Sequence, residues 1–298
     1  MSTVSDEIVL FEKEGPVARL ILNRPEKGNA LPFSGLDRLV GLLHQAEDDD
    51  DVKVIILKGR GPSFCVGDDF EDIAVAYGHV GAAPGRRPPR LSQRERLAID
   101  RRLGRAVYDF QNSAKPVIAQ VHGHCVGIGM YLVEVADLAL CAHSTGFSHA
   151  EQRLGLAGNT FNLATLIVAY GPKKARELLL FGDRFDGPTA ETIGLVNRSV
   201  PDDELESTVE AWAAKVARNA KDALVTGKAA HAMALASLGM SGYIHAGMVG
   251  HALGTNIKFD EGEYNFFRAR RDGGTKDAFQ GRDEHHRHDQ GRQPDEGQ

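Results

Sequence analysis

Cysteine, long apolar runs and surplus positive charge are all scarce in this sequence of 298 residues. Its three cysteines, Cys65, Cys125 and Cys141, form an odd, sparse set that fits a reducing compartment rather than a disulfide framework. The 35 Lys and Arg against 41 Asp and Glu give a net charge of −6, which argues against a nucleic-acid partner. No apolar run approaches the roughly 18 residues that a membrane span needs, and the first residues lack the features of a secretory signal. We therefore expect a soluble, cytoplasmic protein with no membrane partner.

Strand and helix patterns alternate through the first part of the chain. Apolar stretches bounded by turn residues predict strands over residues 7–12, 16–22, 52–58, 116–121, 138–142 and 146–148. Apolar positions at helical spacing predict helices over residues 33–46, 130–136, 173–181, 205–218, 220–238 and 241–258. This order predicts an α/β fold with a helical C-terminal part.

Composition divides the chain into three parts. We expect an α/β core over residues 1–200, a helical region over 201–282 and a disordered polar tail over 283–298, because the tail has no apolar face. Glycine, proline and arginine crowd the stretch 81–90 and would interrupt a helix. Residues 77–94 are therefore expected to form a mobile basic loop within the core.

A glycine-rich turn, Gly127-Ile128-Gly129, comes before a predicted helix. Such a turn can join a strand to a helix without binding any ligand. A dinucleotide-binding fingerprint would need a third glycine where Leu132 stands, so that interpretation fails. The remaining functional interpretation is a helix N-terminus whose amides and dipole favour negative charge.

Seven segments resemble, in the same order, the crotonase family, also called the enoyl-CoA hydratase/isomerase family. They are residues 22–31, 63–70, 115–123, 127–129, 137–140, 147–155, and 181–185 with 194–197. The resemblance covers roughly residues 7–282. It implies a crotonase-like spiral of ββα repeats with a C-terminal helical trimerisation region, assembled as a homotrimer or a dimer of trimers. It also implies an acyl-CoA thioester substrate, an enolate intermediate and no metal or redox cofactor.

Backbone amides are the first catalytic element that such chemistry needs. Making a carbanion beside a thioester moves negative charge onto the thioester oxygen, and losing one preorganised N–H donor to that oxygen costs about 3–4 kcal/mol. The resemblance places the two donors at the amides of Asp68 and Ile128. We expect the Asp68 side chain to point away from the oxygen, because two like charges would oppose each other.

The resemblance also implies an acid–base group at Glu151, which matches the second of the two glutamates with which the family's hydratases hold a water. Tyr131 stands where the first glutamate is expected, and a phenol with a pKa of about 10 is a poor base at neutral pH. Glu134, one helical turn further on, could reach the same side, although we expect it to be exposed or paired with a neighbour. A single base suffices to move a double bond, whereas hydration would need Tyr131 to orient the water.

The reaction type stays open at this point. The leading hypothesis is an enoyl-CoA hydratase or isomerase. An acyl-CoA hydrolase or decarboxylase that uses the same oxyanion hole is the first alternative. A non-catalytic oligomeric scaffold or RNA-binding member of the family is the second, and the acidic net charge argues against RNA.

The histidines near these segments are interpreted as structural. His149 lies two residues before Glu151 and could reach the acyl end of a pocket, whereas His122 and His124 flank a turn. A tetrahedral metal site would need further ligands beside His122, His124 and Cys125. The histidines of the tail are expected to be solvated. We predict no metal site.

The expected CoA contacts also come from the resemblance. They are Lys27, Gly28, Ala30, Phe64, Val66, Gly67 and Gly127, mainly through backbone groups, with Phe279 packing over the site from the same or another subunit. Independently, eight arginines and two acidic residues lie between Arg86 and Arg105. This basic segment could attract the phosphates of CoA, and a solvated helix face is the alternative.

Overall fold

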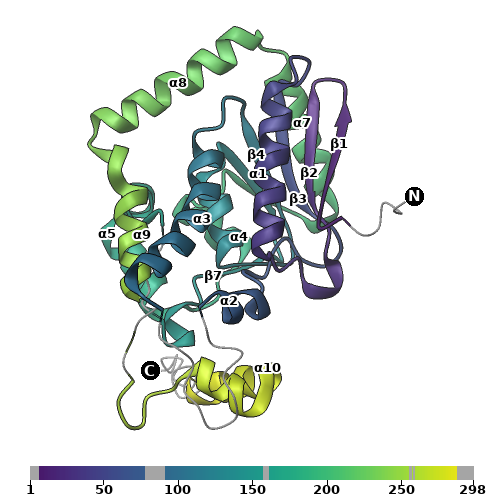
Figure 1. Ribbon diagram of the computed structural model, residues 1–298. Coiled ribbons are helices and arrows are strands. Elements are labelled where there is room, and N and C mark those ends of the chain that lie inside the picture. The colour runs from purple at the N-terminus through teal and green to yellow at the C-terminus, as the bar shows by residue number, and fades with distance from the viewer. Residues whose placement is uncertain (1–6, 78–90, 157–160, 255–256, 258, 287–298) are drawn as a thin grey trace, which may run out of the picture.

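A six-stranded sheet forms the centre of the computed structural model, which describes residues 7–77, 91–156, 161–254, 257 and 259–286 (Figure 1). Strands β1 and β2 pair antiparallel, and the other neighbouring pairs are parallel. In sheet order the strands are β1 (Val9–Glu14), β2 (Val17–Leu22), β3 (Val54–Gly59), β4 (Val117–Val121), β6 (Leu138–Ala142) and β8 (Arg198–Val200). A second, parallel sheet joins β5 (His124–Val126) and β7 (Gly146–Ser148).

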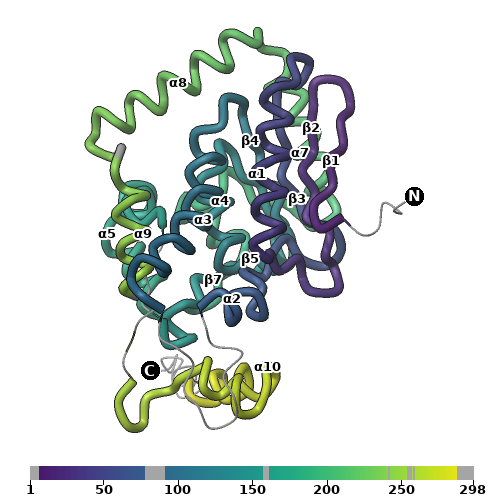
Figure 2. Tube along the Cα trace, viewed as in Figure 1, coloured from purple at the N-terminus to yellow at the C-terminus, as the bar shows by residue number. Residues whose placement is uncertain are grey.

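Helices cover both faces of the large sheet and build the C-terminal part. They are α1 (Phe33–Asp48), α2 (Phe70–Ala76), α3 (Gln93–Gln111), α4 (Ile128–Val135), α5 (Leu163–Phe181), α6 (Gly187–Ile193), α7 (Leu205–Ala217), α8 (Lys221–Ser237), α9 (Tyr243–Gly254) and α10 (Phe266–His285). Figure 2 shows α8 extending away from the body of the molecule towards α9. Among the described residues, no helix combines the length and the apolar character that crossing a bilayer would require.

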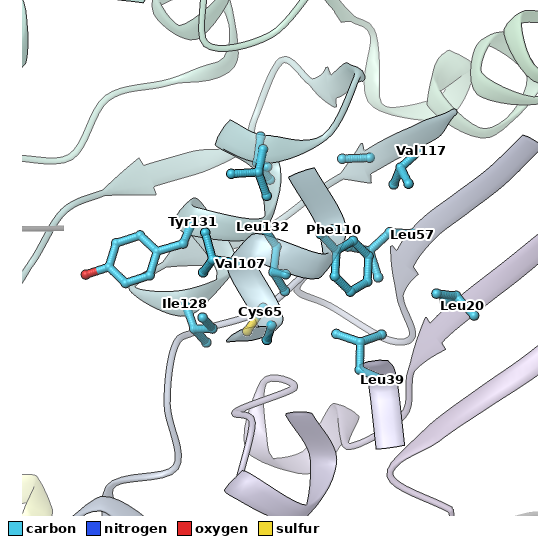
Figure 3. Close-up of a cluster of buried hydrophobic side chains, with 14 of the residues drawn as sticks. Leu20, Leu39, Leu57, Cys65, Val107, Phe110, Val117, Ile128, Tyr131 and Leu132 are labelled. Carbon is cyan, nitrogen blue, oxygen red and sulfur yellow. The ribbon is translucent and has the colours of Figure 1, made fainter. Parts of the chain in front are cut away.

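The alternation of side chains along β3 explains why both faces of the sheet are covered. Ile55 and Leu57 belong to the apolar cluster that includes α1, α3 and α4, whereas Val54 and Ile56 belong to the cluster under α7. Successive side chains of a strand point to opposite faces, so a strand that is apolar at every position is buried on both. Figure 3 shows the first cluster, where Leu57 lies beside Phe110.

Repeated strand–strand–helix units bring chain turns to one edge of the fold. β4, β5 and α4 form one unit, and β6, β7 and α5 form the next, with the first strand of each in the large sheet and the second in the small sheet. An isolated bridge between Cys65 and Cys125 adds the chain after β3 to the edge of the small sheet. The predicted α/β fold of ββα repeats with C-terminal helices is confirmed.

Two predicted irregular segments are partly ordered. Residues 77–94 were expected to be a mobile loop, but Tyr77 is buried, and Ser92 forms a capping box with Glu95 that starts α3. The tail was expected to be disordered from residue 283, but α10 continues to His285, whose ring stacks on Tyr264. Residues 78–90 and 287–298 lie outside the described residues.

Helix α5 begins before the point that the periodicity predicts. Gly171 has a left-handed φ of 76° and is followed by Pro172, so the element consists of two helical pieces across a kink. The sequence pattern revealed the piece after the proline alone. The strands β5 and β8, of three residues each, were not predicted either, because so short an apolar alternation carries little signal.

Candidate active site

Two chain segments meet at the edge of the small sheet. The amide of Cys65 donates to the carbonyl of His124 over 3.0 Å, and the amide of Val126 donates back to the carbonyl of Cys65 over 2.9 Å. Gly127 has a φ of 55°, and a Cβ on it would lie 3.4 Å from the Cα of Gly67. The left-handed φ therefore favours glycine at position 127, and the two turns lie within van der Waals contact of each other.

This packing places the two predicted amide donors on neighbouring turns. Asp68 follows the first segment, and Ile128 is the first residue of α4. Within the described part of the chain, neither amide donates to a backbone oxygen. The amide of Ile128 belongs to the orphan donors of a helix N-terminus, where the dipole favours negative charge.

The side chain of Asp68 differs from its prediction. Its Oδ2 lies 3.9 Å from the point that a Cβ on Gly127 would occupy, so the carboxyl points towards the second turn rather than away from it. Its Oδ1 is buried and has no hydrogen-bond partner among the described residues. Burial raises the pKa of Asp68 to about 7, while the charge of His251 lowers it and that of Glu151 raises it. As the pH falls below about 7, the carboxyl becomes mostly protonated, which removes the like-charge conflict on which the prediction rested.

Tyr131 and Glu151 form a hydrogen-bonded pair. Tyr131 lies on α4 and Glu151 precedes the 3₁₀ turn η3 (Gln152–Leu154), and the phenol donates to Oε1 of Glu151 over 2.6 Å. Figure 3 shows Tyr131 at the edge of the apolar cluster with its hydroxyl directed away from it. Burial, followed by the charge and hydrogen bond of Glu151, raises the pKa of Tyr131 well above its usual range. The phenol therefore stays neutral and acts as a donor.

A buried ion pair lies behind Glu151. Oε1 of Glu134 is 2.7 Å from Nε2 of His149, and its Oε2 accepts a hydrogen bond from the side-chain Nδ2 of Asn162. Glu134 is thus paired, one of the two situations that we expected, and its side chain is 2% exposed. Burial favours the neutral form of His149, but the charge and hydrogen bond of Glu134 outweigh it and raise the pKa of His149. Nδ1 of His149 lies 4.0 Å from Oε2 of Glu151, so the Glu134–His149 pair lies next to the carboxylate of Glu151 but does not hydrogen-bond to it.

A second polar cluster connects α2, α3 and α9. Oδ1 of Asp100, a fully buried residue, accepts a hydrogen bond from the hydroxyl of Tyr77 over 2.8 Å and lies 2.7 Å from Nδ1 of His251. Burial, with the charge and hydrogen bond of Asp100, raises the pKa of Tyr77, so this phenol is also a neutral donor. The ring of Phe161 stacks on His251 at a centroid distance of 4.8 Å and meets Tyr131 edge-on at 5.8 Å.

One glycine explains how α3 and α9 approach closely enough for this contact, and a second lets α9 approach Phe161. A Cβ on Gly104 would lie 2.6 Å from Cε of Met248, and a Cβ on Gly247 would lie 2.5 Å from the carbonyl oxygen of Phe161. Asp100 and His251 each lie four residues from one of these glycines, and therefore on the same helix faces. The sequence analysis missed Tyr77, Asp100 and His251 as site residues. The spacing of four residues between each polar residue and a glycine could indicate that both lie on a packed helix face. This spacing becomes informative only when α3 and α9 are known to pack against each other.

The predicted CoA-binding residues lie around the same edge. The amide of Val66 donates to the carbonyl of Gly28, and the amide of Leu31 donates to the carbonyl of Gly67, so the segment that contains Lys27 and Ala30 runs beside residues 64–68. The side chain of Phe64 is fully buried, which leaves it no surface for a ligand. Phe279 packs within its own chain, with its ring 5.8 Å from that of Phe70 and 5.0 Å from that of Phe266.

The basic segment is largely engaged within the protein where it is described. Arg102 pairs with Asp37 and Arg105 with Asp109, while Arg96 is buried over the ring of Tyr77. Arg86, Arg87 and Arg90 lie outside the described residues.

The histidines at the first turn have structural or surface roles. Nε2 of His122 lies 2.7 Å from the carbonyl oxygen of Gly61, as a residue that holds a turn would, and His124 is exposed. In the part of the chain that the structure describes, no group of three or more His, Cys, Asp or Glu side chains could hold a metal ion.

Comparisons with known proteins identify the family. The family model described as enoyl-CoA hydratase/isomerase matches residues 12–272. The chain is 32% identical over 192 residues to a peroxisomal Delta(3,5)-Delta(2,4)-dienoyl-CoA isomerase of Arabidopsis thaliana, covering 64% of this chain and 68% of that protein. It is 34% identical over 218 residues to a probable enoyl-CoA hydratase of Mycobacterium tuberculosis, covering 72% and 73%.

Solved structures show the same fold. A probable enoyl-CoA hydratase from Mycobacterium thermoresistibile is 28% identical with a TM-score of 0.73, covering 83% of this chain and 94% of that chain. An enoyl-CoA hydratase from Mycobacterium smegmatis is 24% identical with a TM-score of 0.80, covering 95% and 96%, and supports the fold alone. With the family model spanning nearly the whole sequence and the motif residues gathered at one edge of the fold, the chain belongs to the enoyl-CoA hydratase/isomerase family.

Proposed function

We propose that this enzyme moves a carbon–carbon double bond within the acyl group of a CoA thioester. Family membership and the named relatives support hydration or isomerisation of an enoyl-CoA. The observation that favours isomerisation is the hydrogen bond of 2.6 Å from Tyr131 to Glu151. A neutral phenol beside one carboxylate leaves Glu151 as the one general base of this pair, which suits proton transfer between carbons better than activation of a water between two carboxylates.

The proposed reaction begins with the thioester oxygen at the amides of Asp68 and Ile128. Glu151 takes a proton from C2, and the electron pair moves onto the thioester oxygen as an enolate. Each amide donor contributes about 3–4 kcal/mol to stabilising that charge. Return of a proton at C4 completes the shift of the double bond. No metal or redox cofactor takes part in this sequence.

The CoA part of the substrate is proposed to lie along the edge formed by two adjacent segments. The residues concerned are Lys27, Gly28, Ala30, Phe64, Val66, Gly67 and Gly127, through backbone groups at Phe64. The observation in support is the pairing of residues 28–31 with residues 66–69. Phe279 is proposed to close the same site from its cluster with Phe70, which directly follows Asp69.

Hydration is the second candidate, favoured by the printed name of the relative from Mycobacterium tuberculosis. In that reaction Tyr131 would orient a water and Glu151 would carry out the proton transfer. The same oxyanion hole would serve, so the distinction lies in the product and not in the fold.

A panel of acyl-CoA substrates tests the proposal. We expect 3-hexenoyl-CoA to give a product of unchanged mass with a new conjugated absorbance band. This conversion should be faster than the addition of one water to 2-hexenoyl-CoA. Glu151→Gln should lower kcat by at least about a hundredfold. Faster water gain would establish hydration instead, and release of free CoA would establish hydrolysis. Loss of carbon dioxide from a malonyl-type thioester would establish decarboxylation, and inertness towards the whole panel would support a non-catalytic scaffold.

We also propose self-association as a homotrimer or a dimer of trimers, in the cytoplasm. The supporting feature is α8, all of whose residues are described and none of which is buried. Met233 on α8 and Leu238 directly after it are 73% and 71% exposed, and a cavity of about 570 Å³ lies between α8 and the ends of α3 and α4. Apolar side chains left exposed on one helix are typical of a surface that another chain covers. Light scattering of the purified protein would test the assembly.

A further inference from the structure

His251 has the geometry of an oriented acid–base group. Its Nδ1 is bound to Asp100 over 2.7 Å, and its ring is stacked on Phe161, so two contacts fix the imidazole. Among the described residues, no group hydrogen-bonds its Nε2, and the side chain remains 17% exposed. We propose that His251, oriented by Asp100, is the second proton-transfer group of this site and supplies the proton to the carbon remote from the thioester. This inference rests on the proposed isomerisation.

Two ring contacts and one electrostatic effect connect His251 to the proposed reaction centre. Of the charged neighbours of Asp68, His251 has the largest influence on its carboxyl and Glu151 the next largest. The ring of Phe161 lies 5.8 Å from that of Tyr131, nearly perpendicular to it, and 4.8 Å from that of His251, so Phe161 connects the two side chains. His251 therefore lies near the Asp68 turn, as Glu151 does, but belongs to a different helix and approaches from α9.

The buried carboxylate explains which nitrogen of His251 is available. A carboxylate as fully buried as that of Asp100 is stable only when it is paired and hydrogen-bonded, and the phenol of Tyr77 supplies one of its two donors. Because Tyr77 donates, Asp100 accepts, and Nδ1 of His251 must carry a hydrogen. Nε2 is then free to hold or give up the transferable proton. Asp100 is thus a positioning residue that also stabilises the imidazolium. The carboxylate of a catalytic triad acts on its histidine in the same way, but here the histidine transfers its proton to carbon.

Proton transfer between two groups balances without any co-reactant. Glu151 takes a proton from C2 of a 3-enoyl thioester, and the electron pair is held as a dienolate. The pair then forms the C2=C3 bond while the former C3=C4 pair takes the Nε2 proton of His251 at C4. Water removes the proton from Glu151 and returns one to His251 before the next turnover, which the partial exposure of His251 permits.

Deuterium from the solvent distinguishes this mechanism from transfer by Glu151 alone. In D₂O, under initial-rate conditions, we expect wild-type protein to convert 3-hexenoyl-CoA into a product with deuterium at C4, located by NMR. His251→Gln should lower kcat by about a hundredfold or more, and its residual product should carry less deuterium, because Glu151 then returns the proton that it removed. Asp100→Asn should retain the imidazole and lower kcat by about tenfold. It should also change the pH profile of kcat while leaving KM nearly unchanged.

The control is His245→Gln, an exposed histidine on the same helix, whose kcat and deuterium content should match wild type. Equal deuterium at C4 in wild type and His251→Gln, or a kcat within twofold of wild type, would overturn the inference. If His251→Gln does not fold, the inference is tested by the pH profile of kcat for Asp100→Asn. A profile identical to that of wild type would contradict the inference. If the protein is an active isomerase and neither substitution changes its kcat, the role of His251 is wrong but the proposed function holds. If the wild type is inactive on the whole panel, the proposed function itself is wrong.

Discussion

The hydroxyl of Tyr131 lies 2.6 Å from Oε1 of Glu151 and donates a hydrogen bond to it. The two residues belong to successive ββα units, one on the helix of the first unit and the other just after the second strand of the next. The bond therefore links two repeats at the edge where the proposed oxyanion turns meet. It holds one oxygen of the carboxylate and leaves Oε2 without a hydrogen-bond partner among the described residues.

Replacing Tyr131 by Phe should lower kcat by roughly tenfold to a hundredfold with little change in KM. A hydrogen bond to a charged group contributes about 1.5–3 kcal/mol, and without it the carboxylate of Glu151 loses its fixed orientation. Steady-state kinetics on the reactive acyl-CoA would check this, with a thermal melt to show that the variant is folded. A rise in KM at constant kcat would instead assign Tyr131 to substrate binding.

Sequence reasoning reached the Tyr131–Glu151 pair because both residues lie in short motifs with fixed spacing. The motif 147–155 and the turn 127–129 are local patterns, and the family's order of segments places them in adjacent repeats. Their contact could therefore be expected, although the direction of the hydrogen bond required coordinates.

The contacts of Asp100, His251 and Glu134 could not be predicted in the same way. Asp100 appeared only as a negative charge in a basic segment, and its burial depends on the close approach of α3 and α9 at Gly104. Glu134 was expected to be exposed or paired, and its partner depends on how the loop after β7 folds behind α4. Such contacts join residues far apart in the chain, and no local periodicity encodes them.

Removing either partner of the Glu134–His149 pair should destabilise the fold strongly. Breaking a buried ion pair from one side costs about 3–5 kcal/mol, because the other charge stays buried. Glu134→Ala and His149→Ala should each lower the denaturation midpoint, and the double variant should lose less than the two single losses combined. Chemical denaturation of all three measures the coupling.

The same pair should show a defined pH dependence. The folded-state pKa of His149 is raised, so its contribution is fully present below the unfolded pKa of about 6.5 and is lost as the pH rises through the folded value. Burial also raises the pKa of Glu134, which acts in the same direction. The stability difference between wild type and Glu134→Ala should therefore be larger near pH 6 than near pH 9. A difference that grows towards alkaline pH would contradict the pairing.

Asp68→Asn should become more stable than wild type as the pH rises. Burial raises the pKa of Asp68 to about 7, so the folded state holds the proton more tightly than the unfolded chain does. The free energy of unfolding of wild type then falls between about pH 4 and pH 7, by at most about 1.4 kcal/mol per pH unit, and the variant escapes this loss. The titratable groups that face or influence this carboxyl are Glu151, Asp72, His251, Tyr77, Tyr131 and Cys65.

The neighbouring Asp69 provides the matched control for that measurement. Burial opposes its ionisation, but the Arg24 hydrogen bond and the Glu71 amide outweigh this and lower its pKa. Its stabilisation is present above the unfolded pKa and is lost as the pH falls, so Asp69→Asn should be least stable, relative to wild type, at neutral pH. Melting temperatures across the pH range should thus diverge in opposite directions for the two variants. Parallel curves would show that the Asp68 carboxyl is solvated.

Gly129→Ala should disturb the two amide-bearing turns directly. An added Cβ would lie 2.8 Å from the carbonyl oxygen of Cys65 and 2.9 Å from its Cβ, which are fixed by the bridge to Cys125. The start of α4 must then move away from the segment before Asp68, and misplacing one oxyanion donor costs roughly a hundredfold to a thousandfold in kcat.

Gly41→Ala is the control, because Gly41 is an exposed position of α1 with nothing within 4 Å of an added Cβ. That variant should gain about 0.5–1 kcal/mol in unfolding free energy from helix propensity and keep its kcat. If Gly129→Ala is as active as Gly41→Ala, the close approach of α4 to Cys65 does not control the placement of the amides.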